Sequence, residues 1–183
     1  MNRNKVTALL VFAALLVVPP TVRAATVADD GAEVRNVVER AFQQLRAGEY
    51  DGLYDVLPSA SQRRITRERF ARSLANARGM YELDKLDVEA VRVSGELAVV
   101  DMIIYGRVRR PFEGEGKITT RQYVVREAGR WRIAAGDRAI QQQLFSAHPD
   151  FVRRFPARPP RVYLKRDGRW VDLGSLANLR GKS

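Results

Sequence analysis

Hydrophobic positions in the first third of the chain recur at helical spacing. After Asp29 and Asp30, the apolar residues fall three or four positions apart in one stripe: Val34, Val37, Val38, Ala41, Phe42 and Leu45. This spacing predicts an amphipathic helix. Either aspartate can cap its start, and Gly48 is placed to end it.

Two shorter helices are predicted next. The segment 50–57 carries Leu53 among its inward positions and is stopped by Pro58. A third helix opens at Ser61 or Thr66 and ends at Gly79, with Phe70, Leu74 and Ala77 as its apolar stripe.

The periodicity then changes from helical to strand-like. Segments 85–93, 96–108, 116–127 and 130–137 are rich in Val, Ile, Tyr and Trp, with turn residues between them. At the last turn, a three-residue loop with left-handed Gly129 would pair Arg126 with Arg130. That register would place Tyr123 and Trp131 on one face of the sheet. The chain is therefore predicted to be α+β, with N-terminal helices packed on a curved antiparallel sheet.

Residues 138–183 read as a separate basic extension. They allow a short helix over 138–149, an extended Pro-containing linker over 151–160, and a second hairpin about Asp167 and Gly168. The formal net charge of the chain is +11, and this segment holds 10 basic and 3 acidic residues. We expect residues 25–137 to form one domain. The extension should dock loosely through Trp170, and its charge could contact an anionic surface.

The first 24 residues have the layout of a secretory signal peptide. Arg3 and Lys5 precede an apolar run from Val6 to Val18, and small residues follow near Ala24. The run is shorter than the roughly 20 residues that cross a bilayer, although an uncleaved anchor is the alternative. The pattern predicts an exported protein, periplasmic or extracellular. For such a protein nucleic acid is a poor candidate partner.

Composition excludes several chemistries. The chain has 0 Cys and 1 His, so thiol catalysis, disulfides and His-rich metal centres are ruled out. His148, just before a proline, is predicted to lie on the surface. We expect neither a metal nor a cofactor.

Two motifs resemble a known superfamily. The segment AFQQLRAGEYDGLYDVL is similar to the helical entry of the nuclear transport factor 2-like superfamily, and VVREAGRWRI is similar to its closing hairpin. The resemblance covers about residues 30–137 and implies a cystatin-like cone fold. The superfamily includes ketosteroid isomerases, SnoaL-like cyclases and many non-catalytic exported domains. Its members often dimerise through the outer sheet face, which makes a homodimer an expectation by analogy.

The stretch where the isomerases carry a catalytic acid, 58–70, enters a helix here and offers no matching strand. The resemblance therefore favours the exported, uncharacterised branch over the enzymes.

Asp101 is a lone carboxylate inside the apolar run 97–108. A buried carboxylate needs a partner or a raised pKa. Asp101 is either a pocket acid near Tyr105 and Arg121, a structural acid paired to an arginine, or an acid on a partly solvated face where subunits meet. The candidate ligand-binding residues are Asp101, Tyr105, Arg121 and Tyr123.

The predicted function is an exported, non-catalytic binding or accessory domain for an unknown small molecule or protein partner. The alternative is a proton-transfer enzyme of isomerase or cyclase type. In it Asp101 would be the acid or base and Tyr105 the hydrogen-bond donor. A third reading is structural, with the basic extension docked on an anionic surface.

Overall fold

The computed structural model describes residues 27–109, 113–134 and 138–173. The predicted signal peptide, residues 1–24, lies outside this range. Helix α1 (Val27–Ala47) runs through the predicted apolar stripe, with Val34, Val38 and Phe42 buried. Gly48 follows it with φ of 83°, the left-handed conformation that ends a helix.

Three more helices and a single 3-10 turn precede the sheet. They are α2 (Tyr50–Asp55), α3 (Ser59–Arg64), α4 (Arg67–Ala77) and η1 (Arg78–Met80). Thr66 caps α4, because its side chain accepts a hydrogen bond of 3.3 Å from the backbone N–H of Arg69. The predicted third helix is therefore present as α4, with Thr66 as the correct one of its two predicted starts. Ser61 lies instead in the separate helix α3, and the extended backbone of Ile65 divides the two helices.

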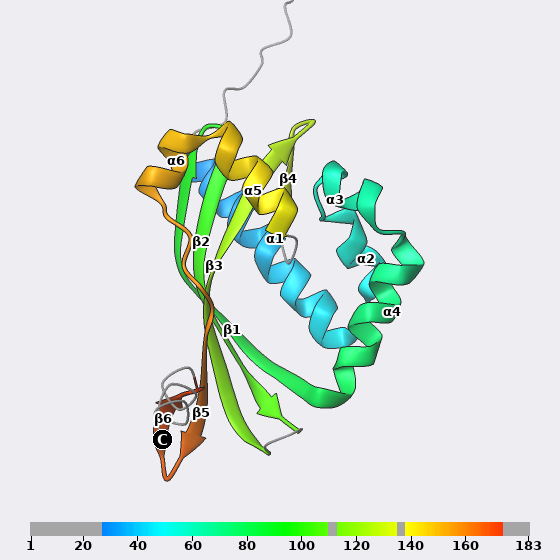
Figure 1. The fold of residues 1–183 in the computed structure, drawn as a ribbon, viewed down its shortest axis with the longest axis vertical. Helices are drawn as coiled ribbons and strands as arrows, with labels where there is room; N and C mark the ends of the chain where they lie inside the picture. Colours follow the sequence, from blue (N-terminus) through cyan, green and yellow to red (C-terminus); the bar gives the residue numbers. More distant parts are fainter. Residues whose placement is uncertain (1–26, 110–112, 135–137, 174–183) are drawn as a thin grey trace, which may run out of the picture.

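The sheet has six antiparallel strands and is not closed. They are β1 (Tyr81–Ser94), β2 (Leu97–Val108), β3 (Gly114–Glu127), β4 (Arg130–Ile133), β5 (Arg161–Arg166) and β6 (Arg169–Asp172). The order is β1-β2-β3-β5-β6, and β4 pairs with the far end of β3. The pairing register of β1 with β2 shifts twice, between Leu83 and Lys85 and between Val88 and Ala90. Such bulges bend a strand, and β1 curves around α1 in Figure 1. The predicted α+β class is confirmed.

The predicted register of the β3–β4 hairpin is wrong by one residue. Glu127 pairs with Arg130 and Arg126 with Trp131, so the loop contains two residues, Ala128 and Gly129. Both have positive φ, 49° and 75°, as a type I′ turn requires. A one-residue change moves side chains to the opposite face. Trp131 consequently packs with α1, on the opposite face from Tyr123.

The C-terminal segment belongs to the same sheet. Helices α5 (Arg138–Ala147) and α6 (Pro149–Arg154) lead into β5, which pairs with residues 116–119 of β3. The predicted helix over 138–149 and the hairpin about Asp167 and Gly168 are both present. The predicted linker is helical up to Arg154. His148 is exposed, as predicted.

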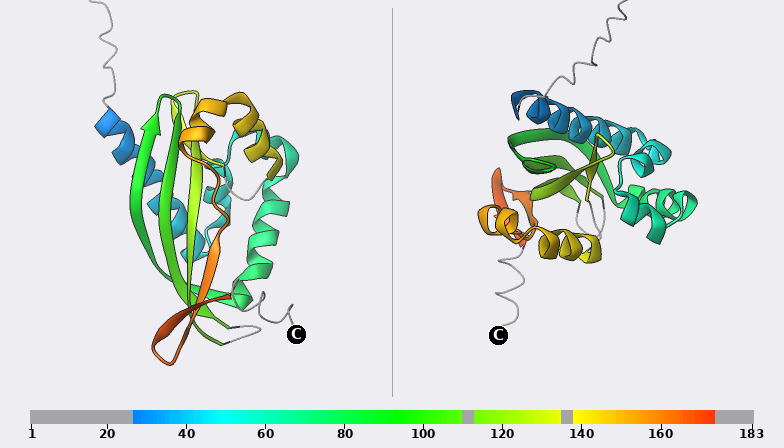
Figure 2. Two further views of the ribbon diagram at one scale, coloured as in Figure 1. Left: turned by 60° about the vertical axis from the view of Figure 1, so that its left-hand side comes forward. Right: turned by 90° about the horizontal axis from the view of Figure 1, so that it is seen from above.

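Two apolar cores lie on opposite faces of the sheet. In Figure 2 (right), α1 lies on one side of the strands and α5 and α6 lie on the other. The inner core joins α1, α2 and the inner faces of β2, β3 and β4, including Val34, Val100 and Trp131. The outer core joins Val99 and Tyr123 to Ile140, Phe151 and Phe155. Residues 138–173 thus supply one of the two layers that cover the sheet.

Candidate functional site

An apolar cavity lies on the inner face of the sheet, between the sheet and the N-terminal helices. Its volume is about 340 Å³. The N-terminal helices and the sheet together provide its lining: Val38, Ala41, Phe42, Leu45, Leu53, Val56, Leu57, Phe70, Leu74, Leu86, Met102, Ile104, Gln122 and Ile133. Gln122 is the one polar residue among them, and its amide Nε2 donates to the carbonyl of Tyr123.

This cavity combines the volume and the apolar lining of a small-molecule site. Protein interiors are close-packed, and voids larger than a water molecule are few. Small-molecule sites begin at about 300 Å³ and are mostly apolar. A lining without a charged group suits an uncharged apolar ligand, because a charge there would lose its hydration without compensation.

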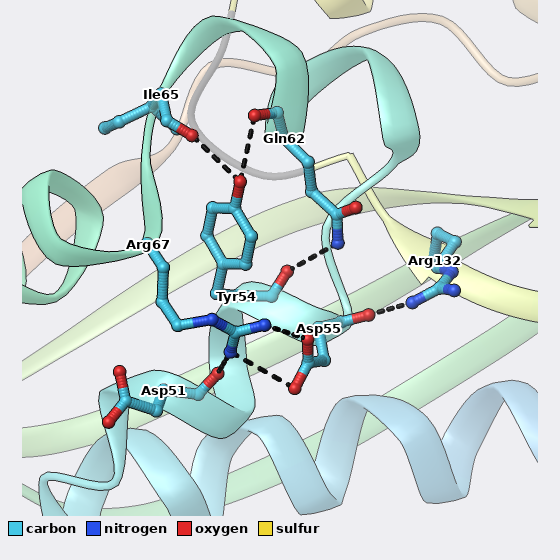
Figure 3. A network of polar contacts seen from close by, with 7 residues as sticks. All are labelled: Asp51, Tyr54, Asp55, Gln62, Ile65, Arg67 and Arg132. Atoms are coloured by element: carbon cyan, nitrogen blue, oxygen red, sulfur yellow. Dashed lines mark hydrogen bonds and ion pairs between the residues drawn. The ribbon is translucent and has the colours of Figure 1, made fainter.

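A polar network holds the helices that wall this cavity (Figure 3). The Tyr54 hydroxyl of α2 lies 2.9 Å from the carbonyl of Gln62 and 3.0 Å from that of Ile65. The Gln62 side chain donates back to the carbonyl of Tyr54 at 2.9 Å. The Tyr54 ring meets Phe70, a cavity residue, edge to face at 6.0 Å. These contacts tie α2, α3 and α4 into one unit.

Arg67 extends the network to the start of α4. Its guanidinium forms a two-pronged ion pair with Asp55, at 2.6 and 3.2 Å, and donates to the carbonyl of Asp51. Hydrogen bonding to Arg67 lowers the pKa of Asp55. Arg132 of β4 donates to the backbone carbonyl of Asp55. The helical wall of the cavity is therefore connected to the sheet through strand β4.

The sequence-predicted residues lie on the opposite, outer face. Asp101 accepts hydrogen bonds from Arg121 at 2.7 and 2.9 Å and from Arg92 at 2.7 Å. The Arg121 side chain is 4% exposed and that of Asp101 16%. The Arg121 guanidinium, with a smaller contribution from Arg92, lowers the pKa of Asp101 to about 2. The carboxylate is thus ionised and paired at neutral pH.

Tyr123 and Arg121 connect the sheet to the C-terminal segment. Arg121 donates to the carbonyl of Pro156 at 3.0 Å, and the Tyr123 hydroxyl donates to the carbonyl of Phe155 at 2.8 Å. The Tyr123 ring packs edge to face on Phe145 and Phe151. Burial raises the pKa of Tyr123. These contacts anchor α5, α6 and the following segment.

Tyr105 stands apart from this group. It lies four residues from Asp101 on the same strand face. Its ring meets Trp170 edge to face at 6.4 Å, and the ammonium of Lys85 lies 5.6 Å from its centroid. The hydrogen bonds that reach the Asp101 carboxylate come from two arginines, and the structure places no Tyr105 hydroxyl among them. The structure thus joins Asp101, Arg121 and, next to them, Tyr123.

A polar hollow of about 300 Å³ adjoins the Asp101–Arg121 pair. Arg158, Arg161, Thr119 and Tyr163 contribute to its lining. Asp172 holds Arg161 at 2.6 Å. This hollow offers hydrogen-bond donors, but the Asp101 carboxylate at its edge is already neutralised by arginine and is a poor base.

The inner cavity was missed by sequence reasoning. The helical stripes identified residues such as Phe70 and Leu74 as inward-facing, and that assignment is correct. A stripe predicts that a helix packs against something, but not that the packing leaves a space. Periodicity alone therefore contained no signal for this site.

Neither a membrane-spanning helix nor a metal centre is present in the part of the chain that the structure describes. No helix there is long and apolar enough to cross a membrane. In the same residues no cluster of three or more His, Cys, Asp or Glu side chains is arranged to hold a metal ion.

Comparison with known proteins corrects the family assignment. No family model and no curated protein matches the chain. Among solved structures, the chain is similar to a SEC-C motif containing protein from Rhodopseudomonas palustris, with 14% identity over 52% of this chain and 70% of that one, at a TM-score of 0.43. The predicted membership of the nuclear transport factor 2-like superfamily is contradicted by these findings. The motifs that suggested it are a glycine-ended helix and a tight hairpin, which local physical chemistry produces in unrelated α+β proteins.

Proposed function

We propose that the protein is a non-catalytic binding module that holds a small apolar molecule in the inner cavity. The observation that carries this proposal is an apolar space of about 340 Å³ between the sheet and the N-terminal helices. The curved sheet and the helices α1, α2 and α4 line it. The network around Tyr54 and Arg67 supports the proposal, because it gives the helical wall a fixed geometry.

The proton-transfer alternative rests on Asp101 and Tyr105, and the geometry favours it less. A general base works best when its pKa lies near the operating pH. Two arginines lower the pKa of Asp101 to about 2, so its carboxylate is a weak base at neutral pH. Asp101 also lies on the face opposite the apolar cavity. We retain the binding function and propose, from the first 24 residues, that it operates outside the cytoplasm.

Titration with the neutral apolar dye Nile red tests the proposal. We expect a rise in dye fluorescence that saturates at one site per chain. Leu74→Trp should weaken binding by about tenfold, because the added ring occupies part of the cavity, as overpacking does in a filled core. Leu74 lines the cavity from α4, whereas its neighbour Ala75 is exposed.

The matched control is Ala75→Trp, which adds the same ring outside the cavity and should leave the affinity unchanged. Circular dichroism melts check that both variants remain folded. Equal affinities for the wild type and a folded Leu74→Trp variant would show that the dye binds elsewhere and would refute the cavity as the site.

A further inference from the structure

A second apolar space, a groove at the surface, adjoins the inner cavity. This groove has a volume of about 410 Å³ and lies at the end of the sheet where β1 begins and β2 ends, the lower end in Figure 1. Leu45 and Ile104 line both the cavity and the groove. The two spaces are therefore neighbours that share part of one wall.

The groove exposes apolar side chains that a folded protein usually covers. Met80 is 50% exposed and Ile118 is 37% exposed, and both line it. A contiguous exposed apolar patch commonly marks a site for a ligand or a partner. The groove thus has the exposed apolar side chains that are typical of a binding surface.

A polar pocket of about 340 Å³ adjoins the groove. The two share Leu45, Tyr81, Glu82 and Leu83 in their linings. The pocket also contains three arginines, Arg46, Arg78 and Arg109, and the phenol of Tyr50. Leu45 accordingly lines the apolar cavity, the groove and the arginine pocket.

Positive charges outnumber negative charges among the residues that line this pocket. Glu82 is its one acidic residue, and Arg109 holds that carboxylate at 2.8 Å. Arg46 donates to the backbone carbonyl of Asp84 at 3.1 Å, and no ion pair joins it to a carboxylate of the described residues. Within the described residues Arg78 forms no ion pair. Among the residues that line it, the pocket therefore carries two positive charges in excess, and it lies beside the apolar groove.

We propose that the ligand is a single-chain amphiphile with an anionic headgroup, such as a fatty acid. Its hydrocarbon chain would lie in the cavity and groove, and its headgroup would accept hydrogen bonds from Arg46 and Arg78. Guanidinium groups bind carboxylate and phosphate with paired, charge-assisted hydrogen bonds. This inference rests on the proposed binding function and adds the ligand class.

Isothermal titration of the full chain with laurate, lauryl alcohol and inorganic phosphate tests the inference. Laurate should bind more tightly than the alcohol of the same chain length, and phosphate alone should bind much more weakly than laurate. The double variant Arg46→Ala/Arg78→Ala should weaken laurate binding by about tenfold, because it removes the charge-assisted hydrogen bonds to the headgroup. Its affinity for lauryl alcohol should remain within about twofold of the wild type.

The control variant is Arg40→Ala/Arg72→Ala, which removes the same net charge from exposed positions on α1 and α4 outside the pocket. If this control weakens laurate binding equally, the effect is one of net charge and the headgroup pocket is refuted. If laurate and lauryl alcohol bind equally and the double variant changes neither, the cavity function stands and the anionic headgroup is wrong. If neither ligand binds, the proposed function itself fails.

Sedimentation of the ligand-free chain tests whether the groove is covered by a second copy of the chain. A monomer that takes up one laurate per chain supports the proposal. If the chain is instead a dimer, and laurate neither binds to it nor separates its subunits, the exposed groove belongs to a second copy of the chain. That result would overturn the proposal.

Discussion

Asp101 of β2 and Arg121 of β3 form an ion pair between two neighbouring strands of the sheet. The Arg121 side chain is almost fully buried, and the Asp101 carboxylate is its charged partner. Removing one member of a buried ion pair leaves the other charge uncompensated, which is more costly than the net contribution of the pair. The pair therefore fixes the position of β3 relative to β2 and, through the Pro156 carbonyl, of the C-terminal segment.

Asp101→Asn should lower the free energy of unfolding by about 2 to 4 kcal/mol, measured by urea melts at neutral pH. The control is Asp87→Asn, whose exposed pair with Lys85 on the same face should contribute less than about 1 kcal/mol. Equal losses in the two variants would contradict the structural role assigned to the buried pair.

The stability of the wild type should also depend on pH through Asp101. Its folded-state pKa is lowered to about 2 from 3.8. A lowered pKa means that the stabilisation is complete above the unfolded value and is lost as pH falls toward 2. Between about pH 4 and pH 2, the Asp101→Asn variant should therefore lose less stability than the wild type. Parallel curves in that interval would show that Asp101 does not titrate as described.

At the scale of single elements, the β3–β4 hairpin depends on a two-residue turn. Ala128 adopts φ of 49° there, a conformation that an alanine side chain disfavours by about 1 kcal/mol or more. Asn and Gly adopt it readily. Ala128→Asn should therefore raise the free energy of unfolding by roughly 0.5 to 1 kcal/mol.

Thermal melts would measure the effect of Ala128→Asn, with Ala147→Asn at the end of α5 as a control that should not stabilise. A destabilised Ala128→Asn variant would contradict the two-residue turn and favour the three-residue loop that the sequence suggested.

The same hairpin shows what sequence patterns determine and what they leave open. The strands and the turn position follow from local residue types, but EAG is compatible with two loop lengths. Only the packing of Trp131 against α1 selects between them. Helix α1 was predictable because its stripe runs along a helix of 21 residues, whereas α3 and α6 are six residues each. An element that short has too few positions for a period to emerge. Helix α2 is also six residues long, and Pro58, which stops it, helped to place it.

At the scale of the whole molecule, the relation between residues 25–137 and 138–183 depends on contacts that no local pattern contains. The sequence suggested a separable basic extension anchored by Trp170. In the structure, the extension contributes buried Ile140, Phe151, Phe155 and Leu164, while Trp170 is 37% exposed. The Tyr123 hydroxyl and the Arg121 guanidinium bond to its backbone. The charge pattern concealed this role, because the apolar residues that pack are few and irregularly spaced.

Truncation after Asp137 should therefore abolish cooperative folding, contrary to the expectation from sequence. Each of the four buried side chains contributes about 1.5 to 3 kcal/mol by burial, and their sum approaches the roughly 5 to 15 kcal/mol that stabilises a typical domain. Point variants give the same test at smaller scale. Phe155→Ala should cost about 3 to 5 kcal/mol in urea melts, and Trp170→Ala about 1 kcal/mol, since its ring is partly solvated. A truncated chain that still unfolds cooperatively, or a Trp170→Ala loss that exceeds that of Phe155→Ala, would show that the outer layer is an appendage. The sheet would then have to be stable with Val99 and Tyr123 exposed on its outer face.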